Sequence, residues 1–151
     1  MAFRPLRPYT GGMTTTATTK PNILMVDDEP DFQTIVHDWL EPSYEHCALK
    51  DGDELIGALH AGAPDLVILD LNLPGADGFE LCRRIRETPG MRDVPILFLT
   101  GSRRPHAYRD NFAAGGTGWL MKPVGRRQLL HAVEELIAKD PSPAVDDGGG
   151  D

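Results

Sequence analysis

The sequence predicts an α/β fold, a doubly wound five-stranded parallel sheet with helices on both faces. Strand-like and helix-like segments alternate five times between residues 21 and 139, the order that βαβ units with right-handed crossovers produce. The strand segments are continuous apolar runs such as Ile23–Val26, a pattern typical of strands covered on both faces. At 151 residues the chain is most simply one domain.

Local signals justify the first elements in order. The five strands are expected at residues 23–26, 44–49, 66–70, 96–100 and 119–122. The first helix begins at Pro30, which suits a first helical turn, and stops before Pro42. Its apolar positions 32, 35, 36, 39 and 40 follow an amphipathic helical period. A short second helix is expected at residues 53–61.

Three further helices complete the pattern. The third runs from Phe79 to near Pro89, after a loop at residues 73–78 that has turn chemistry throughout. The fourth, over about residues 105–114, is weakly patterned. The last presents one apolar face across Leu129–Ile137.

Composition limits the organisation and the partners. Residues 1–20 are predicted to be a disordered leader and residues 140–151 a disordered acidic Gly/Pro-rich tail, which leaves a folded domain at 21–139. The net charge of −8 disfavours direct nucleic-acid binding. We find no membrane span or secretory signal, and we expect a cytoplasmic protein without membrane contact. Cys47 and Cys82 are expected to be buried thiols.

Polar residues end four of the expected strands. Asp27 and Asp28 follow the first strand, and Asp70 ends the third. Thr100 ends the fourth strand and Lys122 the fifth. Parallel strands share one carboxyl edge, so these groups are expected to converge there. The carboxylates suit Mg²⁺, Asp70 suits nucleophilic attack on phosphorus, and Lys122 suits a phosphoryl oxygen.

Each of these residues also has a purely structural interpretation. In that interpretation Asp28 or Glu29 caps the helix that follows, and Asp70 is an ordinary loop residue. Thr100 then reflects β propensity, and Lys122 extends into solvent. Only their joint order and spacing favours the phosphoryl site.

Four motifs carry that order. They are Val26-Asp27-Asp28-Glu29-Pro30, Leu69-Asp70-Leu71-Asn72-Leu73-Pro74-Gly75-Ala76-Asp77-Gly78, Thr100-Gly101 and Lys122-Pro123. Thr100 follows Asp70 by 30 residues, and Lys122 follows Thr100 by 22. Over residues 22–138 the chain resembles the receiver domain of two-component response regulators. The resemblance implies a flavodoxin-like strand order, 2-1-3-4-5.

The resemblance also implies a role for each site residue. Asp70 would be the phosphoacceptor, with Asp28 binding Mg²⁺ directly and Asp27 largely through water. Asn72 would give its backbone carbonyl to the metal. Thr100 and Lys122 would contact the phosphoryl oxygens. The Lys122–Pro123 peptide bond is expected to be cis.

A receiver domain would act as a signalling module. It would take its phosphoryl group from a sensor histidine kinase or a histidine phosphotransfer protein, and it would switch a surface that binds a downstream protein. Its chemistry would be limited to self-catalysed phosphotransfer and autodephosphorylation. We expect a stand-alone receiver, like the chemotaxis regulators, or a receiver excised from a longer chain.

Two features depart from the usual family pattern. Trp119 stands where the family usually has Tyr or Phe, so a switch of that aromatic side chain is in question. Gly115-Gly116-Thr117-Gly118 precedes it, and three glycines predict a loop with unusual backbone freedom. We expect Trp119 and Arg103 to lie near the centre of the partner surface.

Two other classes of protein share parts of this pattern. A haloacid-dehalogenase-like phosphatase also forms an aspartyl phosphate, but it requires a second acid where this chain has Asn72. A flavodoxin-like flavin-binding module requires a phosphate cradle after the first strand, where this chain has Asp27 and Asp28. Both patterns fit less well than the receiver pattern.

Overall fold

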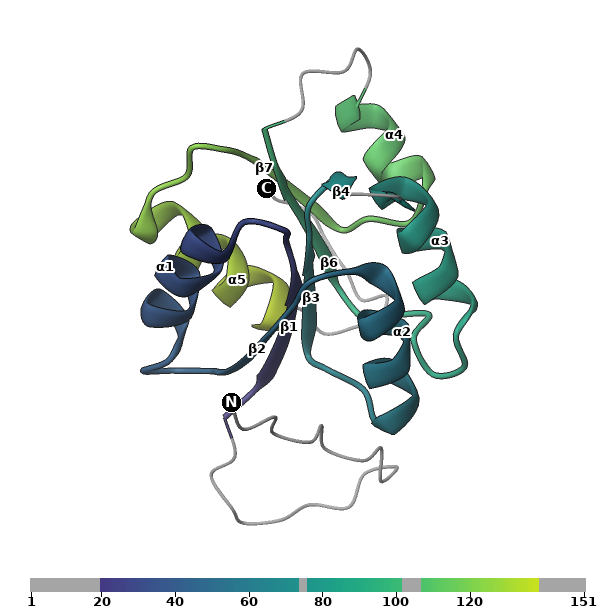
Figure 1. Ribbon diagram of the computed structural model, residues 1–151, viewed down its shortest axis with the longest axis horizontal. Coiled ribbons are helices and arrows are strands. Elements are labelled where there is room, and N and C mark those ends of the chain that lie inside the picture. The colour runs from purple at the N-terminus through teal and green to yellow at the C-terminus, as the bar shows by residue number, and fades with distance from the viewer. Residues whose placement is uncertain (1–19, 74–75, 102–106, 139–151) are drawn as a thin grey trace.

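The computed structural model describes residues 20–73, 76–101 and 107–138 (Figure 1). The predicted tail, and the predicted leader apart from Lys20, lie outside these residues, as does Arg103. The main sheet consists of β1 (Asn22–Val26), β2 (Glu45–Leu49), β3 (Leu66–Leu69), β6 (Ile96–Thr100) and β7 (Gly118–Met121). All neighbouring pairs are parallel, in the order β2-β1-β3-β6-β7. Counted along the chain this order is 2-1-3-4-5, so the predicted topology is confirmed.

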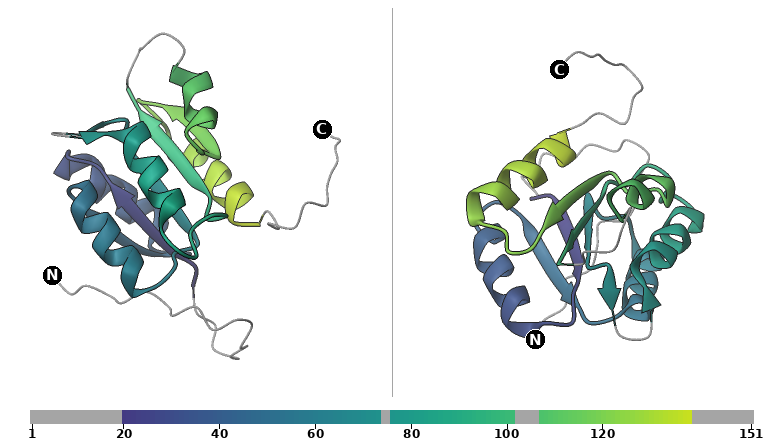
Figure 2. Two further views of the ribbon diagram at one scale, coloured as in Figure 1. Left: turned by 90° about the vertical axis from the view of Figure 1, so that its right-hand side faces the viewer. Right: turned by 90° about the horizontal axis from the view of Figure 1, so that it is seen from above.

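Helices cover both faces of the sheet, as predicted. They are α1 (Pro30–Leu40), α2 (Gly52–Ala61), α3 (Gly78–Glu87), α4 (Ala107–Ala113) and α5 (Arg126–Ala138). α1 and α5 lie on one face, and α2, α3 and α4 lie on the other (Figure 2). No described helix is both long and apolar enough to cross a membrane.

The central strands are buried on both sides because their residues alternate between two cores. In β1, Leu24 and Val26 pack with the α2–α3 layer, whereas Ile23 and Met25 pack with the α1–α5 layer. The neighbouring strands β3 and β6 alternate in the same way. Burial of large apolar side chains on each face contributes about 1.5–3 kcal/mol per residue to folding. This explains why these segments read as continuous apolar runs.

The segment after Asp70 differs from the prediction. We expected a loop over residues 73–78, but β4 (Asn72–Leu73) and β5 (Ala76–Asp77) form a two-stranded antiparallel ribbon. α3 then starts at once, with the Asp77 side chain accepting a hydrogen bond from the Phe79 backbone N–H at 3.1 Å. Strands of two residues are too short to show an alternating apolar pattern, so only the turn-forming residues between them could be recognised in the sequence.

Gly78 is required by a close backbone approach at this point. A Cβ atom on Gly78 would lie 2.7 Å from the Leu71 Cα atom and 2.8 Å from the Asp70 carbonyl oxygen. Any side chain would therefore force the backbone beside Asp70 to move. The start of α3 is thus held against the end of β3.

Arg86 connects the loops at the amino ends of β6 and β7. Its guanidinium donates hydrogen bonds to the backbone carbonyls of Met91, Val94 and Gly115, and to the hydroxyl of Thr117. Thr117 also accepts a bond from the Ile96 backbone N–H at 3.0 Å. The glycine-rich loop before β7, for which the sequence predicts unusual backbone freedom, is thus hydrogen-bonded to Arg86 through the Gly115 carbonyl and the Thr117 hydroxyl.

Candidate functional site

The polar residues at the strand ends meet at the carboxyl edge of the sheet, as predicted. The Asp70 backbone N–H donates to the Val26 carbonyl at 3.1 Å, which aligns the ends of β3 and β1. The Lys122 backbone N–H donates to the Thr100 carbonyl at 2.9 Å, which aligns the ends of β7 and β6. The register of the sheet therefore brings these side chains together, although they lie far apart in the sequence.

Three carboxylates form a cluster at this edge. One oxygen each from Asp27, Asp28 and Asp70 lies within 4.8 Å of the others. Asp27 is 1% exposed and Asp70 is 7% exposed, whereas Asp28 is exposed. Packed like charges repel one another, and a divalent cation with oxygen ligands would relieve that repulsion. The donor set therefore fits Mg²⁺.

Lys122 supplies the positive charge in the cluster. Its Nζ atom lies 2.9 Å from Asp27 Oδ2 and 3.6 Å from Asp70 Oδ2. It also lies 3.0 Å from Glu29 Oε1 and 4.4 Å from the centre of the Phe32 ring. Lys122 therefore points inward, against the solvent-directed alternative, and the Lys122–Pro123 peptide bond is cis, as predicted.

Burial and pairing shift the ionisation of the two central groups. Burial raises the pKa of Asp27, although hydrogen bonds from Lys122 and from the Glu29 backbone lower it in part. Burial lowers the pKa of Lys122, but its bonds to Asp27 and Glu29 outweigh this, and the net shift is upward. Lys122 therefore keeps its charge at neutral pH, which an electrophilic contact to a phosphoryl oxygen requires.

The backbone around Asp27 is held by α1. The Gln33 amide donates to the carbonyls of Asp27 and Leu49, at 2.6 and 2.8 Å. The Glu29 backbone N–H donates to Asp27 Oδ1 at 2.8 Å. Glu29 occupies the N-cap position of α1, and its side chain makes no capping hydrogen bond. The helix-capping alternative for Glu29 is therefore not the arrangement in the structure.

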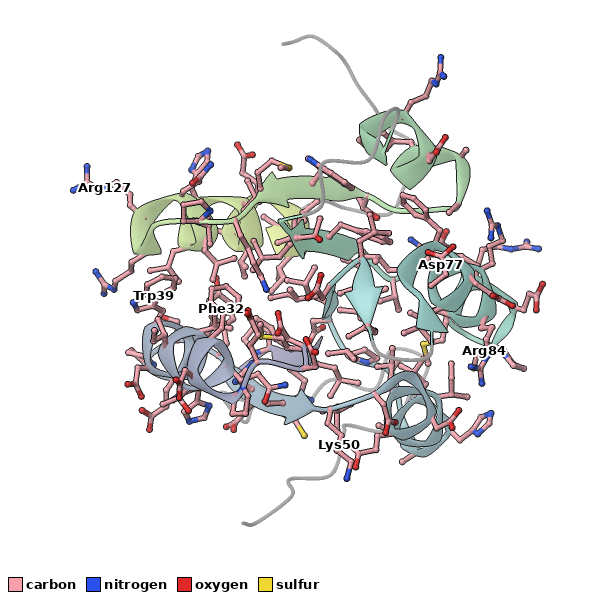
Figure 3. The ribbon with its side chains drawn as sticks, turned by 45° about the horizontal axis from the view of Figure 1, so that its top comes forward. Phe32, Trp39, Lys50, Asp77, Arg84 and Arg127 are labelled. Carbon is pink, nitrogen blue, oxygen red and sulfur yellow. The ribbon has the colours of Figure 1, made fainter. Side chains whose placement is uncertain are left out.

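Glu29, Phe32 and Gln33 also belong to the site, although their sequence pattern alone did not predict it. All three belong to the segment that leaves β1 and begins α1, and Phe32 lies on the inner side of α1 (Figure 3). A signal was present, because an acidic residue and an aromatic residue follow the aspartates within one helical turn. Lys122, which Glu29 and Phe32 contact, lies 90 residues or more further along the sequence.

The other predicted site residues are placed as follows. Thr100 is fully buried at the end of β6, and Asn72 begins β4, two residues after Asp70. Trp119 is partly buried and stacks on Phe98, with ring centres 6.1 Å apart and an angle of 16° between the rings. Arg103 lies outside the described residues.

Comparison with known proteins places this geometry in a family. Residues 23–134 match the response regulator receiver domain family. The Vibrio cholerae chemotaxis response regulator CheY4 has a similar structure, with a TM-score of 0.73 and 31% identity, over 78% of this chain and 99% of that one. The receiver domain of the Pseudomonas aeruginosa sensor histidine kinase PA1611, solved with magnesium in its active-site cleft, is also similar. Its TM-score is 0.73 and its sequence identity 28%, over 80% of this chain and 100% of that one.

Curated relatives agree with this assignment. The Escherichia coli transcriptional regulatory protein BaeR is 32% identical over 120 residues, which cover 79% of this chain and 49% of BaeR. The chain thus spans about half the length of that relative, and it spans 32% of the Xanthomonas campestris cyclic di-GMP phosphodiesterase response regulator RpfG. The comparisons give no support to the dehalogenase-like phosphatase alternative. The chain belongs to the response regulator receiver domain family, the phosphoacceptor signalling domains of two-component systems.

Proposed function

We propose that Asp70 is the residue that accepts the phosphoryl group, in a Mg²⁺-dependent transfer from a sensor histidine kinase or a histidine phosphotransfer protein. The observation that carries this proposal is the joint position of the three clustered carboxylates and Lys122 around one point. Asp27 is already bound by Lys122 and by the Glu29 backbone. Asp70 is clustered with Asp27 and Asp28 and lies 3.6 Å from Lys122 Nζ, so a phosphoryl group on it could meet both the acidic pair and the ammonium.

In the proposed transfer an Asp70 oxygen attacks phosphorus as the bond to the donor's imidazole nitrogen breaks. The product is an acyl phosphate, and the released imidazole carries the bonding electron pair. Bound Mg²⁺ would neutralise charge on the phosphoryl oxygens, held by Asp27, Asp28, Asp70 and the backbone carbonyl of Asn72. Thr100 and Lys122 would donate hydrogen bonds to the same oxygens. Hydrolysis of the acyl phosphate returns the domain to its starting state, so no other catalytic activity is needed.

The output of this modification is proposed to be a protein-binding surface formed by α4, β7 and α5. Both helices pack against β7, an edge strand of the sheet. Phe112 on α4 and Met121 on β7 are exposed apolar side chains of this region, and exposed apolar groups often mark interaction sites. Trp119, on the same strand as Met121, stacks on Phe98, which stacks in turn on Phe79 of α3. This aromatic stack offers a packed connection from the start of α3 to β7.

Phosphorylation is predicted to depend on Asp70 and on Mg²⁺. Incubation with acetyl phosphate and Mg²⁺ should add one phosphoryl group to the wild-type chain, measured by intact mass. Asp70→Asn should keep the fold, judged by circular dichroism, and lose the added mass, because an amide cannot form the acyl phosphate. Chelation of the metal should abolish labelling of the wild type. Persistent labelling in either case would show that the acceptor has been assigned wrongly.

Asp28 is predicted to bind metal at no cost to the fold. Asp28→Ala should weaken Mg²⁺ binding about tenfold or more, since even outer partners at metal sites have effects of this size. Without metal, the free energy of unfolding should stay within about 0.5 kcal/mol of wild type or rise, because a like charge is removed. Titration calorimetry and urea unfolding measure the two quantities. A loss of about 1 kcal/mol without metal would instead indicate a capping role.

Trp119 is predicted to report the switch. In a Trp39→Phe background, Trp119 is the sole tryptophan. Adding Mg²⁺ and beryllofluoride, a phosphoryl mimic, should change its fluorescence if β7 and α4 repack, since two packings need differ by only a few kcal/mol. The same additions to Trp39→Phe with Asp70→Asn are the control. A flat signal while the mimic demonstrably binds would make Trp119 a fixed packing residue and would move the output to another surface.

A further inference from the structure

Glu29 reaches Lys122 from outside the three-carboxylate cluster. Its Oε1 atom accepts a hydrogen bond from Lys122 Nζ at 3.0 Å. The Glu29 side chain is 62% exposed, whereas that of Lys122 is only 17% exposed. The pair therefore joins a residue on the rim of the site to the buried ammonium at its centre.

This contact helps to set the position of the ammonium. Lys122 has three N–H groups, and two of them are engaged with Asp27 and Glu29. Asp70 Oδ2, at 3.6 Å, lies beyond hydrogen-bonding distance. The Phe32 ring lies 4.4 Å from Nζ and favours a cation over its face. In this arrangement Lys122 is bound more closely by Asp27 and Glu29 than by Asp70.

A phosphoryl group on Asp70 would change that balance. If Lys122 bonded a phosphoryl oxygen at about 3 Å while Glu29 stayed in place, the two anions would lie no more than about 6 Å apart. Like charges at that distance repel, and the repulsion is stronger at the edge of a protein than in bulk water. Glu29 can leave at little cost, because its side chain is mostly in solvent and does not cap α1.

We propose that Glu29 is a positioning residue that competes with the phosphoryl group for Lys122. In the unphosphorylated domain Glu29 holds the ammonium towards the β1–α1 segment, and phosphorylation of Asp70 releases it. Glu29 thereby lowers the affinity of the site for a phosphoryl group. The inference rests on the proposed role of Asp70, and it adds that Glu29 is the counter-ion of Lys122 before phosphorylation.

The variant that tests this is Glu29→Gln, which keeps the shape of the side chain and removes its charge. Asp31→Asn is the matched control, since Asp31 is an exposed acid two residues further on in the first turn of α1. Both variants of the full chain are titrated with beryllofluoride at saturating Mg²⁺ by ¹⁹F NMR, and the rate of labelling by acetyl phosphate is followed by intact mass. Mg²⁺ affinity is measured separately, so that metal effects are not attributed to Lys122.

Glu29→Gln should bind beryllofluoride more tightly and label faster by about two- to fivefold, the range expected for one exposed ion pair. Asp31→Asn should stay near wild type. The gain should shrink at high salt, because exposed charges are screened. A gain that disappears in a Lys122→Met background would tie it to Lys122, since a general charge effect would persist there.

The outcomes separate this inference from the proposed function. If the wild type is labelled at Asp70 but Glu29→Gln behaves like wild type, or Asp31→Asn gives the same gain, the competition is refuted while Asp70 keeps its role. If the wild type is not labelled at Asp70 at all, the proposed function fails and the competition fails with it.

Discussion

The site depends on one ammonium among carboxylates at the carboxyl edge of the sheet. Lys122 lies within 3.6 Å of oxygens of Asp27, Glu29 and Asp70. Without this cation, buried Asp27 and Asp70 would be adjacent negative charges with little solvent to separate them. Lys122 makes their burial tolerable in the absence of metal. A phosphoryl group on Asp70 would require the same positive charge. Lys122 therefore both stabilises the buried carboxylates and would bind the phosphoryl group.

Packing far from the site keeps this arrangement in place. The two cores fix the parallel strands in register, and the register aligns the strand ends that carry the polar residues. Gly78 allows α3 to begin directly against the end of β3, and Gln33 holds the ends of β1 and β2. At the opposite edge, Arg86 fixes the loops that lead into β6 and β7. Any movement of β7 would therefore be larger at its carboxyl end, near Lys122, than at its amino end, where Arg86 holds the preceding loop.

Local signals explain why most of the fold could be predicted from the sequence. Apolar runs that stop at Asp27, Asp70, Thr100 and Lys122 predict both the strands and the polar groups at their ends. The strand order and the cis Lys122–Pro123 bond followed from the family resemblance. The β4–β5 ribbon was missed because two-residue strands have no period. Glu29 and Phe32 were missed because Lys122 is distant in the sequence. Arg86 was missed because it joins nearby carbonyls to Gly115, 29 residues away, and no local pattern identifies such a set of partners.

We infer that Lys122 and the three carboxylates form a single site for a phosphoryl group on Asp70. A crystal structure of the chain with Mg²⁺ and beryllofluoride tests it most directly. We expect the adduct on an Asp70 carboxylate oxygen, the ion beside Asp27 and Asp28, and Lys122 Nζ about 3 Å from a fluorine atom, with Glu29 released into solvent. An adduct on another residue, or Lys122 still bound to Glu29 and distant from the adduct, would contradict it.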